Sequence, residues 1–267
     1  MSAFEPFKPD SMMWRLNRER VVLLAGPAAA VLQVAHPQVA MGVAAHSRFR
    51  TDSIGRLRRT LDAVYAVAFG SQSEVARVRQ AVARAHRPVQ GESPQHYSAF
   101  DPGAQLWVLA TLVMASVTMF RRFVGPLTEN ELNQFLVENA RFGEVFGLAP
   151  AMLPTTWEKF EAYWREMIEG PLLGSHPLCA EVARAVVRPD APRSMRVLAP
   201  VFRALALDYL PATLRERLGF SGGPGPRWVW GPLDCTLPLL LRVVPARLRH
   251  APQYLHAIRS RGEDLIQ

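Results

Sequence analysis

The chain has 267 residues, of which 49% are hydrophobic and 20% are charged, so we expect a folded protein with a sizeable core. It contains no repeat or low-complexity stretch, and no Walker A, GxGxxG or GxSxG motif. Nucleotide-binding proteins and serine hydrolases therefore have no motif support, and we predict one domain over residues 1–267.

The formal net charge is +8, and its placement is uneven. From Arg184 to Arg261 there are thirteen arginines and four acidic residues, an excess of nine positive charges. Such a segment is most often a solvated helical face, but it could also contact an acidic partner or a membrane surface. No zinc-finger spacing and no basic motif interleaved with aromatic residues occurs, so nucleic acid is not expected as a partner.

Several features bear on location. Cys179 and Cys235 match no disulfide or metal-binding spacing, which predicts reduced core residues in a cytoplasmic protein. The first ten residues lack the apolar segment and the twin arginine of an export signal. Residues 103–120 carry no charge and approach the length of a membrane span. Because they include Gln105 and Thr111 and follow a turn, we expect a buried central helix there.

Helical periodicity dominates the chain and no strand alternation is evident, so the predicted fold class is all-α. Helix breaks are expected at Gly26-Pro27 and at Pro37, and a glycine–proline loop over 222–226 is the one plausible linker. Ser73 is expected to begin a helix, and Thr128 with Glu131 forms a capping-box sequence. The expected helices cover residues 15–33, 38–46, 53–70, 73–86, 102–120, 129–146 and 156–168, followed by shorter ones.

His86 is the most informative single residue. It follows Val78 and Val82 at helical spacing, so it projects from the apolar face of its helix. A buried imidazole needs a partner for its ring nitrogens. From spacing alone, a backbone carbonyl or a water is the commoner partner, and an axial bond to haem iron is the alternative.

Arg56, Arg59 and Thr60 share one helical face, because they stand at positions i, i+3 and i+4. From the spacing alone, an edge of solvent-facing arginines is the favoured interpretation. Alternatively, a cation and a hydroxyl would line a pocket and position dioxygen or pair with a haem propionate. His36 and His46 fit no metal-binding spacing and are expected to form local hydrogen bonds. No acidic residue occurs between positions 20 and 51, so an acid–base group in that stretch must be a histidine.

Short segments occur in a characteristic order: Gln33-Val34-Ala35-His36-Pro37, His46-Ser47-Arg48-Phe49, Arg56-Leu57-Arg58-Arg59-Thr60, His86 with Val89 and Gly91, Tyr97 with Asp101-Pro102, Trp107-Val108, and Pro154-Thr155-Thr156. Together they resemble the family of the latex-clearing proteins (rubber oxygenases) and the MpaB-type oxygenases. The resemblance covers residues 14–167, and the C-terminal third matches only loosely.

The resemblance implies a helical, globin-like core around haem b. It implies that His86 is the proximal iron ligand, and that Arg56 and Thr60 lie near dioxygen on the distal side. Arg59 stands where rubber oxygenases carry a distal lysine, and arginine is too persistently protonated to bind iron readily. Leu109 replaces a histidine found in many relatives. Residues 20–51, which include no aspartate or glutamate, lack the carboxylate that rubber cleavage is thought to use. These departures argue against cleavage of an extracellular polymer.

The sequence therefore predicts a haem b-dependent oxidoreductase, of oxygenase or peroxygenase type, that acts on a small apolar intracellular substrate. Dioxygen or a peroxide would be the oxidant. Two other interpretations stay open at this stage. One is a non-catalytic haem carrier or gas sensor. The other is a haem-free helical module that binds lipid or a membrane surface through the basic C-terminal third.

Overall fold

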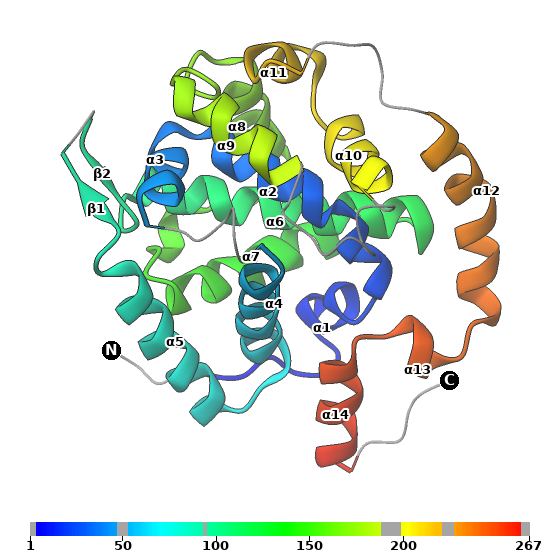
Figure 1. Cartoon of the computed structure of the whole chain (residues 1–267). Helices are drawn as coiled ribbons and strands as arrows, with labels where there is room; N and C mark the ends of the chain where they lie inside the picture. Colours follow the sequence, from blue (N-terminus) through cyan, green and yellow to red (C-terminus); the bar gives the residue numbers. More distant parts are fainter. Residues whose placement is uncertain (1–3, 47–52, 93–94, 188–198, 221–226, 263–267) are drawn as a thin grey trace.

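The computed structural model describes residues 4–46, 53–92, 95–187, 199–220 and 227–262, and these residues are mostly helical (Figure 1). The predicted all-α class is therefore confirmed. The predicted linker over 222–226 lies outside the described residues. The elements are α1 (Met12–Asn17), η1 (Arg20–Ala25), α2 (Gly26–Ala35), α3 (Pro37–His46), α4 (Ser53–Phe69), α5 (Gln72–His86), β1 (Gln90–Gly91), β2 (Tyr97–Ser98), α6 (Pro102–Phe123), α7 (Glu129–Val145), η2 (Pro150–Met152), α8 (Trp157–Glu169), α9 (Pro177–Val187), α10 (Ala199–Asp208), α11 (Ala212–Arg217), α12 (Arg227–Val243), α13 (Ala246–Arg249) and α14 (Pro252–Ser260).

Local capping sets several helix starts. Thr128 accepts a hydrogen bond from the backbone of Glu131, whose carboxylate bonds back to the Thr128 amide at 2.7 Å, so the predicted capping box is confirmed. The predicted start of α5 at Ser73 is wrong, because Ser71 forms the box with Glu74 and the helix begins at Gln72. The Ser71 side chain is the one placed before the first helical turn, where a cap must lie.

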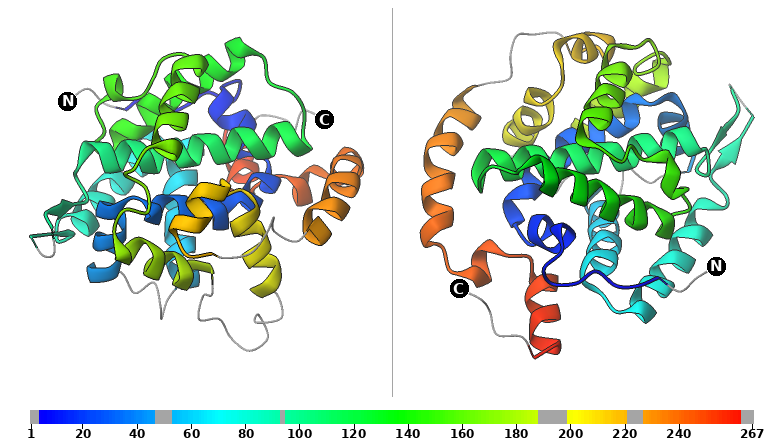
Figure 2. Two further views of the ribbon diagram at one scale, coloured as in Figure 1. Left: turned by 90° about the horizontal axis from the view of Figure 1, so that it is seen from above. Right: turned by 180° about the vertical axis from the view of Figure 1, so that it is seen from behind.

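The long helix α6 runs through the centre of the molecule (Figures 1 and 2). Its length and composition would suffice to cross a membrane, and α3 with the preceding helical segment 20–35 also passes that test as a pair bent by 100°. However, 61% of the most apolar window of α6 is buried inside the protein. Trp107 is fully buried and donates a hydrogen bond from its indole nitrogen to the carbonyl of Leu32 in α2 at 2.8 Å. The structure therefore favours a core helix, as predicted for residues 103–120.

Two short strands follow α5, although the sequence shows no strand alternation. They form an antiparallel pair in which Gln90 lies opposite Ser98 and Gly91 opposite Tyr97. The pairing depends on a close approach at Gly91, where a Cβ would lie 2.7 Å from the Tyr97 ring. Glycine is required at position 91 because two chain segments come into contact there, and helical periodicity in the sequence does not reveal such a contact.

The C-terminal helices return to the N-terminal part of the chain. Glu19 is buried and accepts hydrogen bonds from Arg249 at 2.7 and 3.0 Å, while the Ala251 amide bonds to the Arg18 carbonyl. Cys179 is buried as predicted, but the prediction for Cys235 is wrong, because its side chain is exposed. It lies on the outer side of α12, where the helix has no described neighbour to cover it.

Candidate functional site

The helical hairpin of α4 and α5 positions His86. The chain reverses at Gly70 and Ser71, and α5 ends at His86, where Arg87 still has helical geometry but Pro88 has no backbone N–H to continue the helix. At about 1.5 Å per residue, Arg56 in α4 and His86 in α5 both lie about 20 Å from this turn. The two helices contact each other, and Figure 1 shows them inclined to each other and diverging away from the turn.

The His86 side chain is half-buried, and its Nδ1 atom is inaccessible to solvent. Within the described part of the chain, this nitrogen has no hydrogen-bond partner. The ring of Phe100 contacts the imidazole edge-on. Burial lowers the pKa of His86 below 6.5, which favours the neutral imidazole that a metal ligand must be. A buried and unsatisfied nitrogen costs stability, so it points to a group that would complete the site.

The three predicted residues of α4 lie on one helix, and the structure describes the side chains of two of them. Arg59 and Thr60 have exposed side chains and are not packed into the core. The side chain of Arg56 lies outside what the structure describes, although its backbone is part of α4. Their assignment to the distal side of a haem therefore remains a prediction.

Two further histidines lie on α3 or next to it. His36 is buried, and its Nδ1 atom also lacks a hydrogen-bond partner among the described residues. Burial lowers the pKa of His36, and the nearby charge of Asp101 opposes this shift. His46 is exposed, and its Nε2 lies 3.0 Å from the Tyr97 hydroxyl. His46 therefore has a hydrogen-bond partner, but the partner is Tyr97, 51 positions away, and not a local group as expected.

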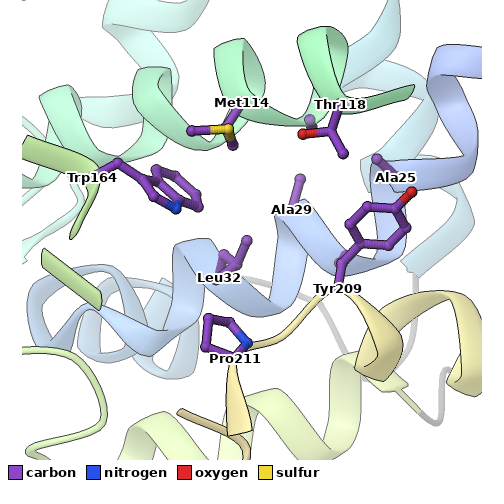
Figure 3. A pocket seen from close by; sticks show the side chains of 10 residues that line it. Ala25, Ala29, Leu32, Met114, Thr118, Trp164, Tyr209 and Pro211 are labelled. Atoms are coloured by element: carbon purple, nitrogen blue, oxygen red, sulfur yellow. The ribbon is translucent and has the colours of Figure 1, made fainter. Parts of the chain in front are cut away.

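An apolar cavity of about 190 Å³ lies between α2, α6 and the segment after α10 (Figure 3). Met114 and Thr118 of α6 face Ala29 and Leu32 of α2 across it, as Figure 3 shows. The complete lining is Ala25, Ala28, Ala29, Leu32, Met114, Ala115, Thr118, Trp164, Tyr209 and Pro211. The cavity suits a small apolar molecule, since a cavity of about 150 Å³ is known to hold benzene. His86, Arg59 and Thr60 do not contribute to the lining.

The described residues contain no group of three or more histidine, cysteine, aspartate or glutamate side chains that could hold a metal ion. A metal centre built on His86 would therefore need most of its ligands from a prosthetic group. Haem provides four equatorial nitrogens and needs only one helical histidine. The unpartnered ring nitrogen of His86 fits that requirement, and His36 and His250 also carry buried ring nitrogens without a partner among the described residues.

Comparison with known proteins identifies the family of this chain. Residues 13–245 match the family model described as the catalytic domain of ER-bound oxygenase mpaB/B′ and rubber oxygenase. Two mycobacterial proteins, Rv2237 of Mycobacterium tuberculosis and Mb2261 of Mycobacterium bovis, are each 30% identical over 195 residues. The alignment covers 71% of this chain and 75% of either relative. No solved structure gives a significant match.

The family match extends well beyond residues 14–167, because it also includes α9 to α12. It therefore includes most of the C-terminal third, which resembled the family only loosely by its motifs, but not α13 and α14. The family is of oxygenase type, which supports an enzymatic function. The chain belongs to the family of mpaB-type and rubber oxygenase catalytic domains.

Proposed function

We propose that this protein is a haem b-dependent oxygenase that acts on a small apolar substrate inside the cell. The observation that carries the proposal is the buried Nδ1 atom of His86, which has no partner among the described residues. It stands at the end of α5, in a chain whose family is of oxygenase type. His86 would hold the haem through its imidazole.

The residues of α4 would act on the oxidant and on the carboxylates of the cofactor. Arg56 would present a permanent positive charge where negative charge develops during the reaction. The hydroxyl of Thr60 would donate a hydrogen bond to the oxidant, and Arg59 would pair with a carboxylate of the cofactor. Haem b bound in this way would supply the iron centre that activates dioxygen or a peroxide.

The apolar cavity of Figure 3 supports the proposed class of substrate. Its lining is mostly alanine, leucine, methionine and tryptophan side chains, which contribute apolar contacts. Thr118 and Tyr209 are the lining side chains that carry a hydroxyl. The Tyr209 hydroxyl accepts a hydrogen bond from Arg122 at 2.8 Å, so it is already engaged within the protein. We therefore propose a substrate bound by shape and apolar contact more than by hydrogen bonds.

The function is tested by producing the full chain with haem supplied and recording absorption spectra before and after dithionite. We expect a Soret band corresponding to one haem per chain. Loaded protein supplied with reductant and dioxygen, or with a peroxide, should then convert small apolar alkenes or aromatic compounds. A protein that binds haem but turns over none of these would be a carrier or gas sensor. A protein that stays colourless with added haemin would contradict the proposal.

A further inference from the structure

The outer side of α12 is an unusual surface, because its exposed residues are mainly apolar. The inner side of the helix is anchored by Trp230, which is 3% exposed, and by Asp234, which accepts a 2.6 Å hydrogen bond from Arg122. Arg122 also stacks over the Trp230 ring at 4.2 Å. These contacts fix which side of α12 faces the protein and which side faces outward.

Four large apolar side chains point outward from this region. Leu239, Leu240 and Val243 of α12 are 62%, 49% and 77% exposed, and Leu248 of α13 is 59% exposed. They are half of the eight large hydrophobic residues that are exposed in the described part of the chain, yet they fall within ten positions. Scattered exposed hydrophobic residues are ordinary, but a concentrated group marks an interaction surface.

We name these four residues the α12–α13 patch. Figures 1 and 2 show α12 and α13 along the outer edge of the molecule in all three views. The first three patch residues lie at positions i, i+1 and i+4 of one helix and therefore share a face. Solvent-facing positions of a surface helix normally carry polar residues, so this apolar face is suited to contact with an apolar surface outside the protein.

The charged residues between positions 235 and 262, the stretch that contains the patch, are all arginines. Arg242 and Arg247 are exposed beside the patch residues, whereas Arg249 is occupied by its ion pair with Glu19. The sequence has no aspartate or glutamate from position 235 to position 262. The surface thus combines outward leucine and valine side chains with flanking guanidinium groups that no nearby acidic residue in the sequence offsets.

We propose that the α12–α13 patch docks the protein on a membrane surface that contains anionic lipids. The leucine and valine side chains would enter the boundary between headgroups and acyl chains, and Arg242 and Arg247 would contact lipid phosphate and carboxylate groups. A second copy of this chain fits less well. A symmetric dimer through this patch would bring the same arginines of two molecules together, at a net charge of +8 for each chain.

This docking does not depend on haem. It would serve the proposed oxygenase by placing it where apolar molecules accumulate. It also gives one physical role to the arginine excess of the C-terminal third, because attraction to an anionic surface grows with each cation close to it.

Vesicle binding by the purified full chain tests the proposal. Sedimentation should recover the protein with vesicles of phosphatidylcholine containing about a third phosphatidylserine, and not with phosphatidylcholine alone. High salt should release it, because screening weakens the arginine contacts. The double variant Arg242→Gln/Arg247→Gln should bind the anionic vesicles about 30-fold more weakly. Leu239→Ser/Val243→Ser should also bind more weakly, through loss of the apolar contact.

Matched controls separate the patch from general effects. Arg77→Gln/Arg84→Gln removes two exposed arginines from α5 and should bind like the parent chain. Val137→Ser changes a 54% exposed valine of α7 and should also bind normally. Equal losses in the control and patch variants would overturn the proposal, as would no binding of the parent chain. A concentration-dependent dimer that Leu239→Ser/Val243→Ser abolishes would show that a second copy covers the patch, and would overturn it too.

Discussion

The imidazole of His86 meets the ring of Phe100 edge-on, with 6.2 Å between the ring centroids. Phe100 follows β2, so the short hairpin supports the histidine that ends α5. The contact limits the orientations available to the imidazole, and ring orientation matters for a group that binds a metal. The hairpin is therefore part of the candidate site, although its own residues do not include a predicted ligand.

Replacing Phe100 by alanine should weaken haem binding without abolishing it. An edge-on aromatic contact contributes about 0.5–1.5 kcal/mol, so the affinity for haem should fall about threefold to tenfold. Titration of the apoprotein with haemin measures this change. Leu172→Ala, at an apolar side chain that is 43% exposed, is the control and should leave the affinity unchanged. Equal affinities for Phe100→Ala and the parent chain would show that this contact does not position His86.

Gly91→Ala should destabilise the hairpin. The added methyl group would lie 2.7 Å from the ring of Tyr97, which is buried and whose hydroxyl lies 3.0 Å from His46. Because the ring has little room to move, we expect a cost of about 1–3 kcal/mol in the free energy of unfolding. Urea denaturation measures this cost. Gly125→Ala is the control, since no atom lies within 4 Å of an added Cβ there. Similar stabilities for the two variants would refute the tight approach at Gly91.

Glu19 should make the stability depend on pH. Burial alone would raise its pKa, but His250 and Arg249 outweigh burial and hold the pKa below 4.5. His250 Nε2 lies 3.4 Å away, so it acts through proximity more than through a well-aligned hydrogen bond. With a lower pKa in the folded state, the carboxylate stabilises the fold above about pH 4.5, and this stabilisation is lost as the pH falls through the folded-state value.

Glu19→Gln removes that ionisation. The variant should be less stable than the parent chain by about 2–3 kcal/mol at neutral pH, because it leaves Arg249 without its charged partner. The difference should shrink when urea denaturation is repeated below pH 4. Glu158→Gln, at an exposed carboxylate of α8, is the control and should change little at either pH. A difference that stays constant with pH would contradict the assigned role of the Glu19 carboxylate.

Filling the apolar cavity should prevent small molecules from binding there. Ala29 is 4% exposed and faces the cavity, so Ala29→Leu would occupy part of its 190 Å³. Benzene should raise the melting temperature of the parent chain, because a ligand that binds only the folded state stabilises it. The same concentration should raise that of Ala29→Leu much less. Val137→Leu adds bulk on the exposed side of α7 and should respond like the parent. An equal shift in all three proteins would place the bound benzene elsewhere.

Much of the helical framework could be predicted because its signals are local. Pro37, Pro88 and the Thr128 capping box act within a few residues, and each marks a helix boundary in the structure. The start of α5 was misplaced by one position, since Ser71 and Ser73 offer the same chemistry and only backbone geometry shows that Ser71 is the cap.

The arrangement of the site depends on contacts that local patterns do not contain. The His46–Tyr97 pair joins residues 51 positions apart, and Glu19 and Arg249 are 230 positions apart. Spacing placed His86 on the apolar face of its helix, and α5 does end at that residue. Spacing could not show that Nδ1 would be buried without a described partner, because burial there also depends on segments that follow the helix.

Comparing the haem content of His86→Ala and His36→Ala tests whether His86 holds the haem. Both histidines carry a buried Nδ1 atom without a described partner, so each variant is the matched control for the other. Both proteins and the parent chain would be produced with haem supplied, and the Soret absorbance would be measured per chain. We expect that His86→Ala loses the haem, while His36→Ala keeps one haem with the parental spectrum. Full haem content and an unchanged spectrum in His86→Ala would contradict it.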